Sequence, residues 1–541
     1  MEKWSIPLRL PQQRYECLFG QRVLQCYAER PLSVYEIFAK AVAERGDAEA
    51  LVCEGQRLSY RDLSSLVDQL AVGLSGLNVR QGDRVAIWVG NRSEFIVILG
   101  ALLKLGAIAV PLSTRLQTPE VAFILGQCSA SVLIYEASLA ARLPDMQETP
   151  ELIHRIQVGA VGDVKLGISF SKLFGDLGPC NSANQHKEED TAMILYTSGT
   201  TGRPKGAMLT HVNIVHTLIN YQQMMGLSIE DRSVLAVPGS HVTGILALIM
   251  TAWQAQSALV MMPEFKARDF LNLIEKERIT HTIIVPAMYT LCLLQPDFEQ
   301  YDLSSWRVGG FGGAPMPAAT IAEFAKKVPG LGLRNVYGST ETSSPVTMMP
   351  ASQTALRPDS VGLVLPGVQI LVMDPKGIEV GLGEAGELWI AGPMVIPGYW
   401  ENPQATKDSF VAGYWRSGDI GSIDAEGFVR VFDRVKDMIN RGGYKIYSLE
   451  VENVLCHHSA ISECAVVGQY CEVLGERVIA HIKLRPDQAV TAKELRDYCL
   501  ERLADYKVPE TFIFSESPLP RNANGKLLKR TLRSQPDSIN P

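Results

Sequence analysis

The chain has 541 residues, 46% of them apolar and 20% charged, so it is long enough for more than one domain and has ample material for buried cores. Its net charge is −7 and it contains no basic block, which excludes the electrostatic signature of a nucleic-acid-binding protein. Ten cysteines are scattered without C-x-x-C pairs, and Cys456-His457-His458 lacks zinc-ligand spacing. This cysteine usage is typical of reduced thiols in a cytoplasmic protein.

The N-terminal residues and the most apolar runs decide whether a secretory signal or a transmembrane segment is expected. Residues 1–16 have an acidic second residue and no apolar core, so no secretory signal is expected there. The apolar run 95–112 is interrupted by Lys104, and the run 245–255 is too short to span a bilayer. We therefore expect buried helices and strands and no transmembrane segment, while contact of a surface helix with a membrane stays open.

Strand-like runs then alternate with helical patterns over more than half of the chain. A helix is expected over 93–106, opened by Ser93, and the expected strands are 84–90, 107–112, 191–198, 257–263, 281–287 and 306–313. Such alternation predicts an α/β fold in layered subdomains, with largely parallel, buried strands.

From about residue 360 the pattern changes to short strands separated by Gly- and Asp-rich turns. The runs 368–374, 386–392 and 427–434 predict a small, mainly antiparallel β subdomain. The tail then predicts a helix over 448–458 with Ser448 as N-cap, strands over 461–469 and 477–485, and a helix over 491–503 with Thr491 as cap. We place the boundary in the segment 433–443, which gives an N-terminal domain of residues 1–435 and a small mobile α+β domain of residues 436–541.

The segment YTSGTTGRPKG, residues 196–206, follows a predicted buried strand and combines hydroxyls, glycines and one lysine. Backbone N–H groups of a Gly-rich turn, hydroxyls and an ammonium group can together bind phosphate oxygens. The segment is not a Walker motif, because Gly206 follows Lys205 where that motif has Ser or Thr. It closely resembles the phosphate-binding loop of the adenylate-forming superfamily, which includes acyl-CoA synthetases, adenylation domains of peptide synthetases, and luciferases.

Five further segments resemble motifs of that superfamily and occur in the same order. They are GGFGGAP (309–315), YGSTE (337–341), WRSGD (415–419), DRVKDMINRGGYKI (433–446) and PRNANGKLLKR (520–530). The resemblance covers the chain from about residue 35 to residue 530 and is most like a free-standing AMP-forming acyl-CoA synthetase.

The resemblance implies a set of site residues for ATP, Mg²⁺ and coenzyme A. Catalytic roles fall to Lys526, His241, Thr340 and Glu341, and Glu341 is also the expected Mg²⁺ ligand. Asp419 and Arg434 would bind the ribose, Lys436 would be the pivot of domain rotation, and Gly443 and Lys445 would move beside the pantetheine thiol. The residues expected to bind nucleotide or coenzyme are Thr197, Ser198, Gly199, Thr200, Thr201, Gly202, Lys205, Gly313, Ala314, Pro315, Tyr337, Gly338, Ser339, Asp419, Arg434, Lys436, Gly443 and Lys445.

The implied activity is ATP-dependent adenylation of a fatty or aryl carboxylic acid, followed by thioester formation with CoA. In the first step two anions must be brought together, so neutralisation of charge is the main task, and Mg²⁺, Lys205 and Lys526 would share it. The expected partners are a small carboxylic acid, ATP and CoA, with no nucleic acid, and the sequence leaves a homodimer open. Such an enzyme would serve fatty-acid or aryl-acid metabolism in the cytoplasm.

His241 departs from the family pattern, because Gly239 and Ser240 precede it where relatives often have an aromatic residue. It either lines the carboxylate site or is a hydrogen-bonded core histidine. The acid itself is not specified by the sequence. The expected pocket segments, 237–248, 288–290, 311–315 and 338–346, carry apolar side chains such as those of Val242, Ile245, Met288, Pro345 and Val346.

Alternative functions remain open at this point. An amino-acid adenylation module would carry an aspartate in the segment 237–245 for the substrate ammonium, and this segment has none. A stand-alone adenylation enzyme that loads a carrier protein and a non-catalytic acyl- or nucleotide-binding paralogue are further alternatives. Against the non-catalytic paralogue stands the joint presence of Lys205, Glu341, Asp419, Arg434 and Lys526. Nothing in the sequence requires the oxygen chemistry of a luciferase.

Overall fold

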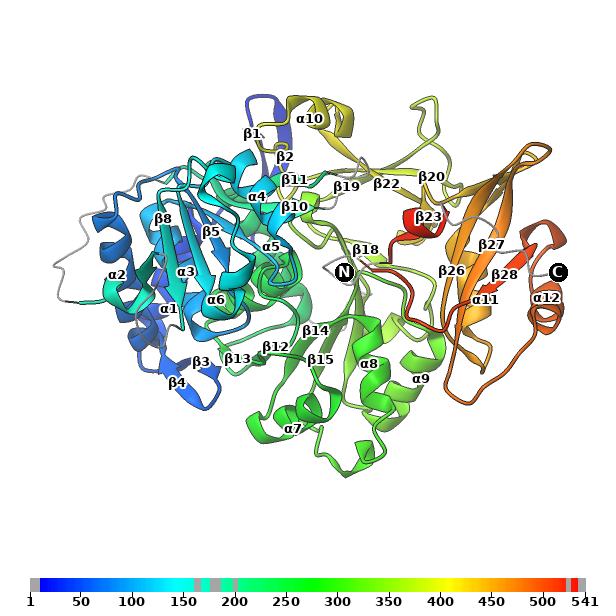
Figure 1. Cartoon of the computed structure of the whole chain (residues 1–541), viewed down its shortest axis with the longest axis horizontal. Coiled ribbons are helices and arrows are strands. Elements are labelled where there is room, and N and C mark those ends of the chain that lie inside the picture. Colours follow the sequence, from blue (N-terminus) through cyan, green and yellow to red (C-terminus); the bar gives the residue numbers. More distant parts are fainter. Residues whose placement is uncertain (1–9, 160–166, 176–185, 198–202, 522–526, 534–541) are drawn as a thin grey trace. The chain divides into compact units, whose positions relative to one another are not determined.

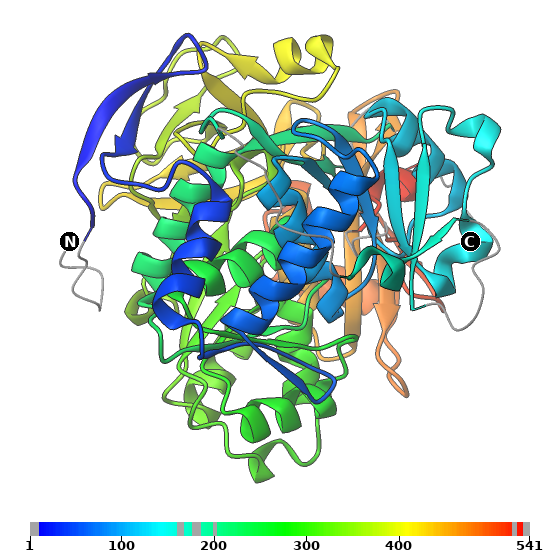
Figure 2. The same cartoon turned by 90° about the vertical axis from the view of Figure 1, so that its left-hand side faces the viewer.

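The computed structural model describes residues 10–159, 167–175, 186–197, 203–521 and 527–533 (Figures 1 and 2). The chain forms two compact units. The large unit contains Met1–Ile370 and Ile390–Trp415, and the small unit contains Leu371–Trp389 and Arg416–Pro541. The division into domains 1–435 and 436–541 stays a prediction.

The first sheet of the large unit has seven strands in the order β11-β10-β6-β5-β7-β8-β9. Neighbours from β10 to β9 are parallel, and β11 closes an antiparallel hairpin with β10. The expected strand runs 84–90 and 107–112 contribute to this sheet, as does 191–198 as far as Thr197. Its strands are β5 (Arg84–Trp88), β6 (Ile108–Pro111), β7 (Val132–Glu136), β8 (His154–Val158), β9 (Ile168–Ser169), β10 (Thr191–Thr197) and β11 (Lys205–Thr210).

The second sheet of the large unit runs in the order β4-β3-β13-β12-β14-β15-β16-β17-β18. Its central neighbours, from β3 to β16, are parallel. The strands are β3 (Glu49–Cys53), β4 (Gln56–Ser59), β12 (Arg232–Leu235), β13 (Ala258–Met261), β14 (His281–Ile284), β15 (Val308–Phe311), β16 (Gly332–Tyr337), β17 (Thr347–Met348) and β18 (Gly362–Val364). A separate hairpin pairs β1 (Gln13–Leu18) with β2 (Arg22–Tyr27).

Helices α2 (Tyr60–Gly76) and α3 (Ser93–Leu105) lie between these two sheets (Figure 2). Helix α3 packs on β5 and β6, and α2 packs on α3, β3 and β4. A Cβ at Gly100 of α3 would lie 2.7 Å from a Val67 methyl group of α2, so glycine permits this close packing. Because α3 is covered on all sides, its side chains are apolar around most of its circumference.

The other helices of the large unit cover the two sheets. Several begin with a side-chain cap, such as Ser33 before α1 and the Thr210–Asn213 capping box of α5. They are α1 (Val34–Arg45), α4 (Thr118–Gln127), α5 (His211–Met225), the π-helix η4 (Thr243–Met250), α6 (Thr251–Ala255), α7 (Ala267–Glu277), α8 (Pro286–Leu293), α9 (Ala318–Lys327) and α10 (Pro403–Ser409).

The small unit contains two groups of strands. The first has the order β19-β20-β22-β23, and the second has the order β25-β24-β27-β26 with β28 beside β27. Its elements are β19 (Gln369–Met373), β20 (Gly386–Ala391), β22 (Tyr414–Ile423), β23 (Phe428–Arg434), β24 (Ile439–Arg441), β25 (Tyr444–Ile446), β26 (Ile461–Cys471), β27 (Gly475–Leu484), β28 (Thr511–Phe514), α11 (Ser448–Cys456), α12 (Ala492–Leu500) and α13 (Lys529–Arg533). Strand β21 (Phe410–Val411) pairs with Tyr414 and Trp415 at the start of β22, and all four residues belong to the large unit.

This architecture confirms the expected α/β class with layered subdomains, a β subdomain and an α+β tail. Two local predictions are wrong. The run 281–287 is a strand only to Ile284, because Pro286 starts α8, where a missing N–H costs nothing. Ser448 is the first residue of α11 and not its cap, since its hydroxyl accepts a hydrogen bond from the Lys529 ammonium. In the described residues, no helix is both long and apolar enough to cross a bilayer.

Candidate functional site

The predicted site segments of the large unit follow strands of the second sheet at one edge. Strands β12, β14, β15 and β16 are parallel neighbours, so their carboxyl ends meet at that edge. The segment with His241 follows β12, the glycine turn 312–315 follows β15, and residues 338–341 follow β16. Ligands of open α/β sheets usually bind at this edge.

Glu341 is a buried carboxylate, only 8% exposed, in the turn after β16. Its Oε1 atom accepts hydrogen bonds from the hydroxyls of Thr197, at 3.3 Å, and Tyr399, at 3.0 Å. Its other oxygen accepts a hydrogen bond from the Ser339 hydroxyl. The structure thus brings the predicted residues Thr197, Ser339 and Glu341 together around one carboxylate.

The expected phosphate loop starts and ends at paired positions of the β10–β11 hairpin. Thr197 pairs with Lys205 across the two strands. The predicted residues Ser198, Gly199, Thr200, Thr201 and Gly202 lie outside the described residues. A Cβ at Gly206 would lie 2.7 Å from an Ile194 methyl group, which explains why glycine follows the lysine.

Tyr399 joins this cluster and was not among the predicted site residues. The segment 398–400 runs beside β11, where Tyr399 bridges to Ala207 and the Trp400 amide donates to the Gly206 carbonyl at 2.7 Å. The Lys205 ammonium lies 4.9 Å from the centre of the Tyr399 ring. Burial, and then the charge of Glu341, raise the pKa of Tyr399, so its hydroxyl remains a donor.

The glycine turn 312–315 allows strands β15 and β16 to approach each other closely. A Cβ at Gly312 would lie 2.3 Å from the Val336 carbonyl oxygen of β16, and Gly313 has φ +77°. The following Ala314 and Pro315 are exposed. This geometry brings the turn against the end of β16, where Tyr337 is half-buried.

Two side chains of helix α5 contact the end of the turn Gly338–Ser344. Tyr221 and Ser344 share a hydroxyl hydrogen bond of 2.8 Å, and the Thr217 hydroxyl donates to the Ser344 carbonyl at 3.3 Å. A Cβ at Gly338 would lie 2.8 Å from Pro345 Cα. The half-buried Thr340 therefore sits in a turn whose backbone is fixed on both sides.

His241 stands at the start of a π-helix after β12. Asn91 fixes the preceding segment, because its side chain donates to the Val237 carbonyl at 3.0 Å and accepts from the Gly239 amide at 2.7 Å. Burial lowers the pKa of His241 below its ordinary value, so the imidazole is neutral at pH 7. A role of this residue at the carboxylate site stays a prediction. The expected pocket residues Val242, Ile245, Met288, Pro345 and Val346 are all buried.

In the small unit, Asp419 and Arg434 form the expected pair. They are opposite each other in β22 and β23, and Arg434 Nε lies 3.0 Å from Asp419 Oδ1. The Asp419 side chain is 7% exposed and that of Arg434 is 37% exposed. A buried carboxylate with a more exposed guanidinium suits hydrogen bonding to vicinal hydroxyls, which need both acceptors and donors.

The predicted pivot, Lys436, is an exposed residue in a tight turn after β23. The Asp437 and Met438 amides both donate to the Arg434 carbonyl at 2.9 Å. Arg533 of α13 forms an ion pair of 2.8 Å with Asp437. These contacts fix the backbone on both sides of Lys436, and partial burial lowers the pKa of its ammonium.

Gly442 and Gly443 form the turn between β24 and β25. Both have positive φ, +58° and +90°, which is the conformation of a two-residue hairpin turn and favours glycine. Lys445 follows on β25 and is exposed. Lys526, the predicted catalytic lysine, lies outside the described residues.

Among the described residues, no cluster of three or more His, Cys, Asp or Glu side chains could hold a metal ion. Glu341 nevertheless fits Mg²⁺, because this ion commonly takes one or two protein carboxylates and completes its shell with water and substrate phosphates. The hydroxyls around Glu341 add hard oxygen atoms to the site.

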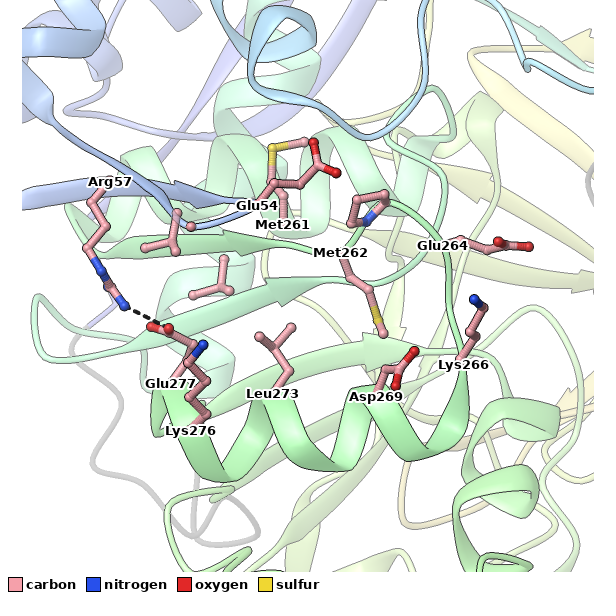
Figure 3. Close-up of a pocket in the computed structure, with 14 residues that line it drawn as sticks. Glu54, Arg57, Met261, Met262, Glu264, Lys266, Asp269, Leu273, Lys276 and Glu277 are labelled. Atoms are coloured by element: carbon pink, nitrogen blue, oxygen red, sulfur yellow. Dashed lines mark hydrogen bonds and ion pairs between the residues drawn. The ribbon is translucent and has the colours of Figure 1, made fainter. Parts of the chain in front are cut away.

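A hollow of about 580 Å³ lies elsewhere in the large unit, between α7 and the edge of the second sheet (Figure 3). Met261 and Met262 line it beside charged residues of both signs, and an ion pair of 2.7 Å between Arg57 and Glu277 lies at one side. None of the predicted site residues lines this hollow. It is therefore distinct from the candidate site.

Comparison with known proteins points to one family. Residues 38–400 match the family model "AMP-binding enzyme", and residues 450–526 match "AMP-binding enzyme C-terminal domain". The chain is 34% identical over 479 residues to the long-chain-fatty-acid–CoA ligase FadD13 of Mycobacterium tuberculosis, which covers 88% of this chain and 93% of that protein. It is 33% identical over 485 residues to a feruloyl-CoA synthase of an Amycolatopsis species, covering 88% and 94%.

The solved structure of o-succinylbenzoate CoA synthetase (MenE) of Bacillus subtilis in complex with ATP and magnesium ion superposes with a TM-score of 0.82. It is 30% identical in sequence, and the match covers 92% of this chain and 99% of that chain. The same synthetase has been solved with its acyl-adenylate intermediate, OSB-AMP.

Proposed function

The chain belongs to the AMP-binding enzyme family, and from this premise we propose that it is an AMP-forming carboxylic acid–CoA ligase. In the first half-reaction the carboxylate of the acid attacks the α-phosphate of ATP, and pyrophosphate leaves. In the second, the thiol of CoA attacks the acyl carbon of the acyl-adenylate, which yields the thioester and AMP.

The observation that carries the proposal is the cluster around Glu341. A carboxylate that is 8% exposed, with no ammonium or guanidinium among its hydrogen-bond partners in the described residues, is costly unless a cation completes its site. Mg²⁺ held there would supply a Lewis acid beside the phosphates of ATP. Lys205 pairs with Thr197 in the β10–β11 hairpin and would bind phosphate oxygens.

The Lys205–Tyr399 contact gives the lysine a defined position before ATP arrives. The ammonium lies over the aromatic ring at 4.9 Å and has no carboxylate to neutralise it in that contact. This ring contact competes less strongly with phosphate oxygens for the ammonium than a direct carboxylate pair would, so binding of a polyanion is favourable. Tyr399 would act as a positioning residue, since its hydroxyl also orients Glu341.

Roles in the small unit follow the family resemblance. Asp419 and Arg434 would bind the ribose, and Lys526 would neutralise charge as the carboxylate meets the α-phosphate. Rotation about Lys436 would then remove Lys526 and bring Gly443 and Lys445 to the thiol. Thr340 would contact a phosphate oxygen, and Tyr337 would stack on the adenine beside Gly313, Ala314 and Pro315.

The substrate class is a monocarboxylate with an apolar body, fatty or aromatic. Val242, Ile245 and Met288 are apolar and buried, and no acidic residue occurs in the segment 237–245. A buried substrate ammonium without a partner would cost several kcal/mol. The named relatives act on a long-chain fatty acid and on ferulate, which supports the same class.

The experiment measures pyrophosphate release with a panel of fatty, aryl and α-amino acids, with and without CoA. We expect CoA-dependent turnover with an apolar monocarboxylate. A free α-amino acid as the best substrate would contradict the substrate class, and turnover that needs a carrier protein in place of CoA would contradict the ligase. A cytoplasmic location and a homodimer remain predictions, which cell fractionation and sedimentation would test.

A further inference from the structure

Two cysteines face each other between α11 and β26 of the small unit. Cys456 is the last residue of α11, Cys464 lies in β26, and their sulfur atoms are 3.3 Å apart. Eight positions separate them in the sequence, and they do not form a C-x-x-C motif. Their proximity arises from the fold, because α11 packs on β26.

The contact between helix and strand is well supported around the two sulfur atoms. The Cys464 thiol lies 3.4 Å from the Glu452 carbonyl oxygen, to which it can donate. The Glu452 carboxylate accepts from the Val466 amide at 2.7 Å and pairs with the Lys529 ammonium at 2.6 Å. The Cys464 thiol and the Val466 amide of β26 therefore both contact Glu452 of α11, and Lys529 of α13 pairs with the same glutamate.

The two thiols differ in exposure and in acidity. Cys456 is exposed and Cys464 is partly buried. The contact between the two sulfur atoms lowers the pKa of the Cys456 thiol, and the same contact, together with burial, raises the pKa of Cys464. An exposed thiol that ionises first, next to a second thiol, is the arrangement of an attacking and a resolving cysteine.

We propose that Cys456 and Cys464 are a redox modification site that forms a reversible intramolecular disulfide by exchange with a low-molecular-weight disulfide. The Cys456 thiolate attacks one sulfur of that disulfide, whose S–S bond breaks and releases one thiol. Cys464 loses its proton to solvent and attacks the sulfur of Cys456, which releases the second thiol. The two cysteines lose two electrons in total, and the small disulfide gains them.

The bond requires only a local shift. The sulfur atoms must move from 3.3 Å to about 2.05 Å. Cys456 ends its helix, so the last turn can move without breaking a longer run of helical hydrogen bonds. The bond would fix α11 on β26, and α11 also binds Lys529 through Glu452 and Ser448.

The test exposes the full-length protein to buffers of increasing glutathione disulfide over glutathione. Samples are quenched with acid, free thiols are blocked with N-ethylmaleimide, and the protein is cleaved after glutamate. Cleavage after Glu452, Glu463 and Glu472 puts Cys456 in the peptide 453–463 and Cys464 in the peptide 464–472. We expect these two peptides to appear joined, with a mass lower by two hydrogen atoms than their sum.

Matched variants identify the partner sulfur. The peptide 464–472 also contains Cys471, so Cys471→Ser should leave the joined peptides unchanged. Cys464→Ser should abolish them and leave Cys456 as a mixed disulfide with glutathione. Should Cys464→Ser not fold, Cys456→Ser at the exposed position is expected to abolish the joined peptides in the same way.

A chemical probe of dithiol proximity provides a second measurement. Phenylarsine oxide binds two thiols at once, and we expect it to protect Cys456 and Cys464 from N-ethylmaleimide while the exposed Cys17 stays reactive. Equal labelling of Cys456, Cys464 and Cys17 at every glutathione ratio would overturn the proposal. Joined peptides that disappear in Cys471→Ser would overturn it as well.

Discussion

Replacing Glu341 with glutamine tests the role of the cluster most sharply, because it retains the shape of the side chain and removes its charge. The carboxylate is 8% exposed and accepts hydroxyl hydrogen bonds from Thr197, Tyr399 and Ser339. A unit charge about 4 Å from a cation contributes about 4 kcal/mol at an effective dielectric constant near 20. Loss of one preorganised electrostatic contact in an active site typically lowers kcat by about 10²–10³-fold.

We therefore expect Glu341→Gln to lower the rate of adenylation by about 10²–10³-fold and to raise the Mg²⁺ concentration needed for half-maximal rate. ATP–pyrophosphate exchange, followed as Mg²⁺ is varied, measures both effects. Tyr399→Phe is the matched control, since it removes one hydroxyl donor 3.0 Å from Oε1 and leaves the ring under Lys205. The control should lose only about tenfold.

Circular dichroism and thermal melting check that the glutamine variant is folded. Glutamine offers one oxygen where the carboxylate has two, so one hydroxyl must change partner and Tm should fall slightly. Near wild-type exchange at limiting Mg²⁺ would show that Glu341 does not bind the metal. A loss in Tyr399→Phe as large as that in Glu341→Gln would show that the charge is not the main factor.

Three further predictions concern the half-reactions, pH and packing. Lys526→Ala should form thioester from synthetic acyl-adenylate and CoA but almost no adenylate from ATP. Lys436→Pro should do the reverse, because proline fixes φ at the pivot. Equal loss of both half-reactions in Lys526→Ala would contradict domain rotation. Burial lowers the pKa of His216 to about 4, so the folded state binds fewer protons than the unfolded state below about pH 6.5, and stability that is fully present above that pH is lost as the pH falls toward 4. Burial also lowers the pKa of His211 to about 4 and that of His281 to about 3, so the test is the difference between wild type and His216→Gln: urea denaturation at several pH values should show about 3 kcal/mol less loss in the variant, and an equal loss in both proteins would contradict the assignment. Gly312→Ala should destabilise the protein by about 1–3 kcal/mol, since its Cβ would lie 2.3 Å from a carbonyl oxygen, whereas Gly330→Ala, with no atom within 4 Å, should melt like the wild type.

The candidate site residues were predicted from the resemblance of short segments to family motifs, and strand direction explains why several of those segments meet. Glycine- and hydroxyl-rich segments follow β15 and β16, and parallel neighbours carry such segments to one edge of a sheet. Asp419 and Arg434 were likewise expected from the resemblance, and they are opposite each other in the neighbouring strands β22 and β23.

Tyr399 could not be found in this way, because its role depends on pairing between residues far apart in the sequence. It meets Lys205 and Glu341 only because the segment 398–400 runs beside β11. An aromatic residue between Gly398 and Trp400 was the only local signal. Cys456 and Cys464 illustrate the same limit, since the packing of a helix on a strand brings them together.

The π-helix η4 was also beyond local pattern. Its apolar run was expected to be a buried element, and the structure shows a buried π-helix. Gly244 packs so closely on the segment before His241 that a Cβ would lie 2.2 Å from the Pro238 carbonyl oxygen. Such bulges often occur at functional sites.

The fate of the oxygen atoms of the acid tests the central claim most directly. The acid is supplied with ¹⁸O in its carboxylate, together with ATP, Mg²⁺ and CoA, and the products are analysed by mass spectrometry. If the carboxylate attacks the α-phosphate and the thiol then displaces AMP, one labelled oxygen must appear in AMP and none in pyrophosphate. Thioester formation with unlabelled AMP would contradict an acyl-adenylate intermediate, and with it the proposed function.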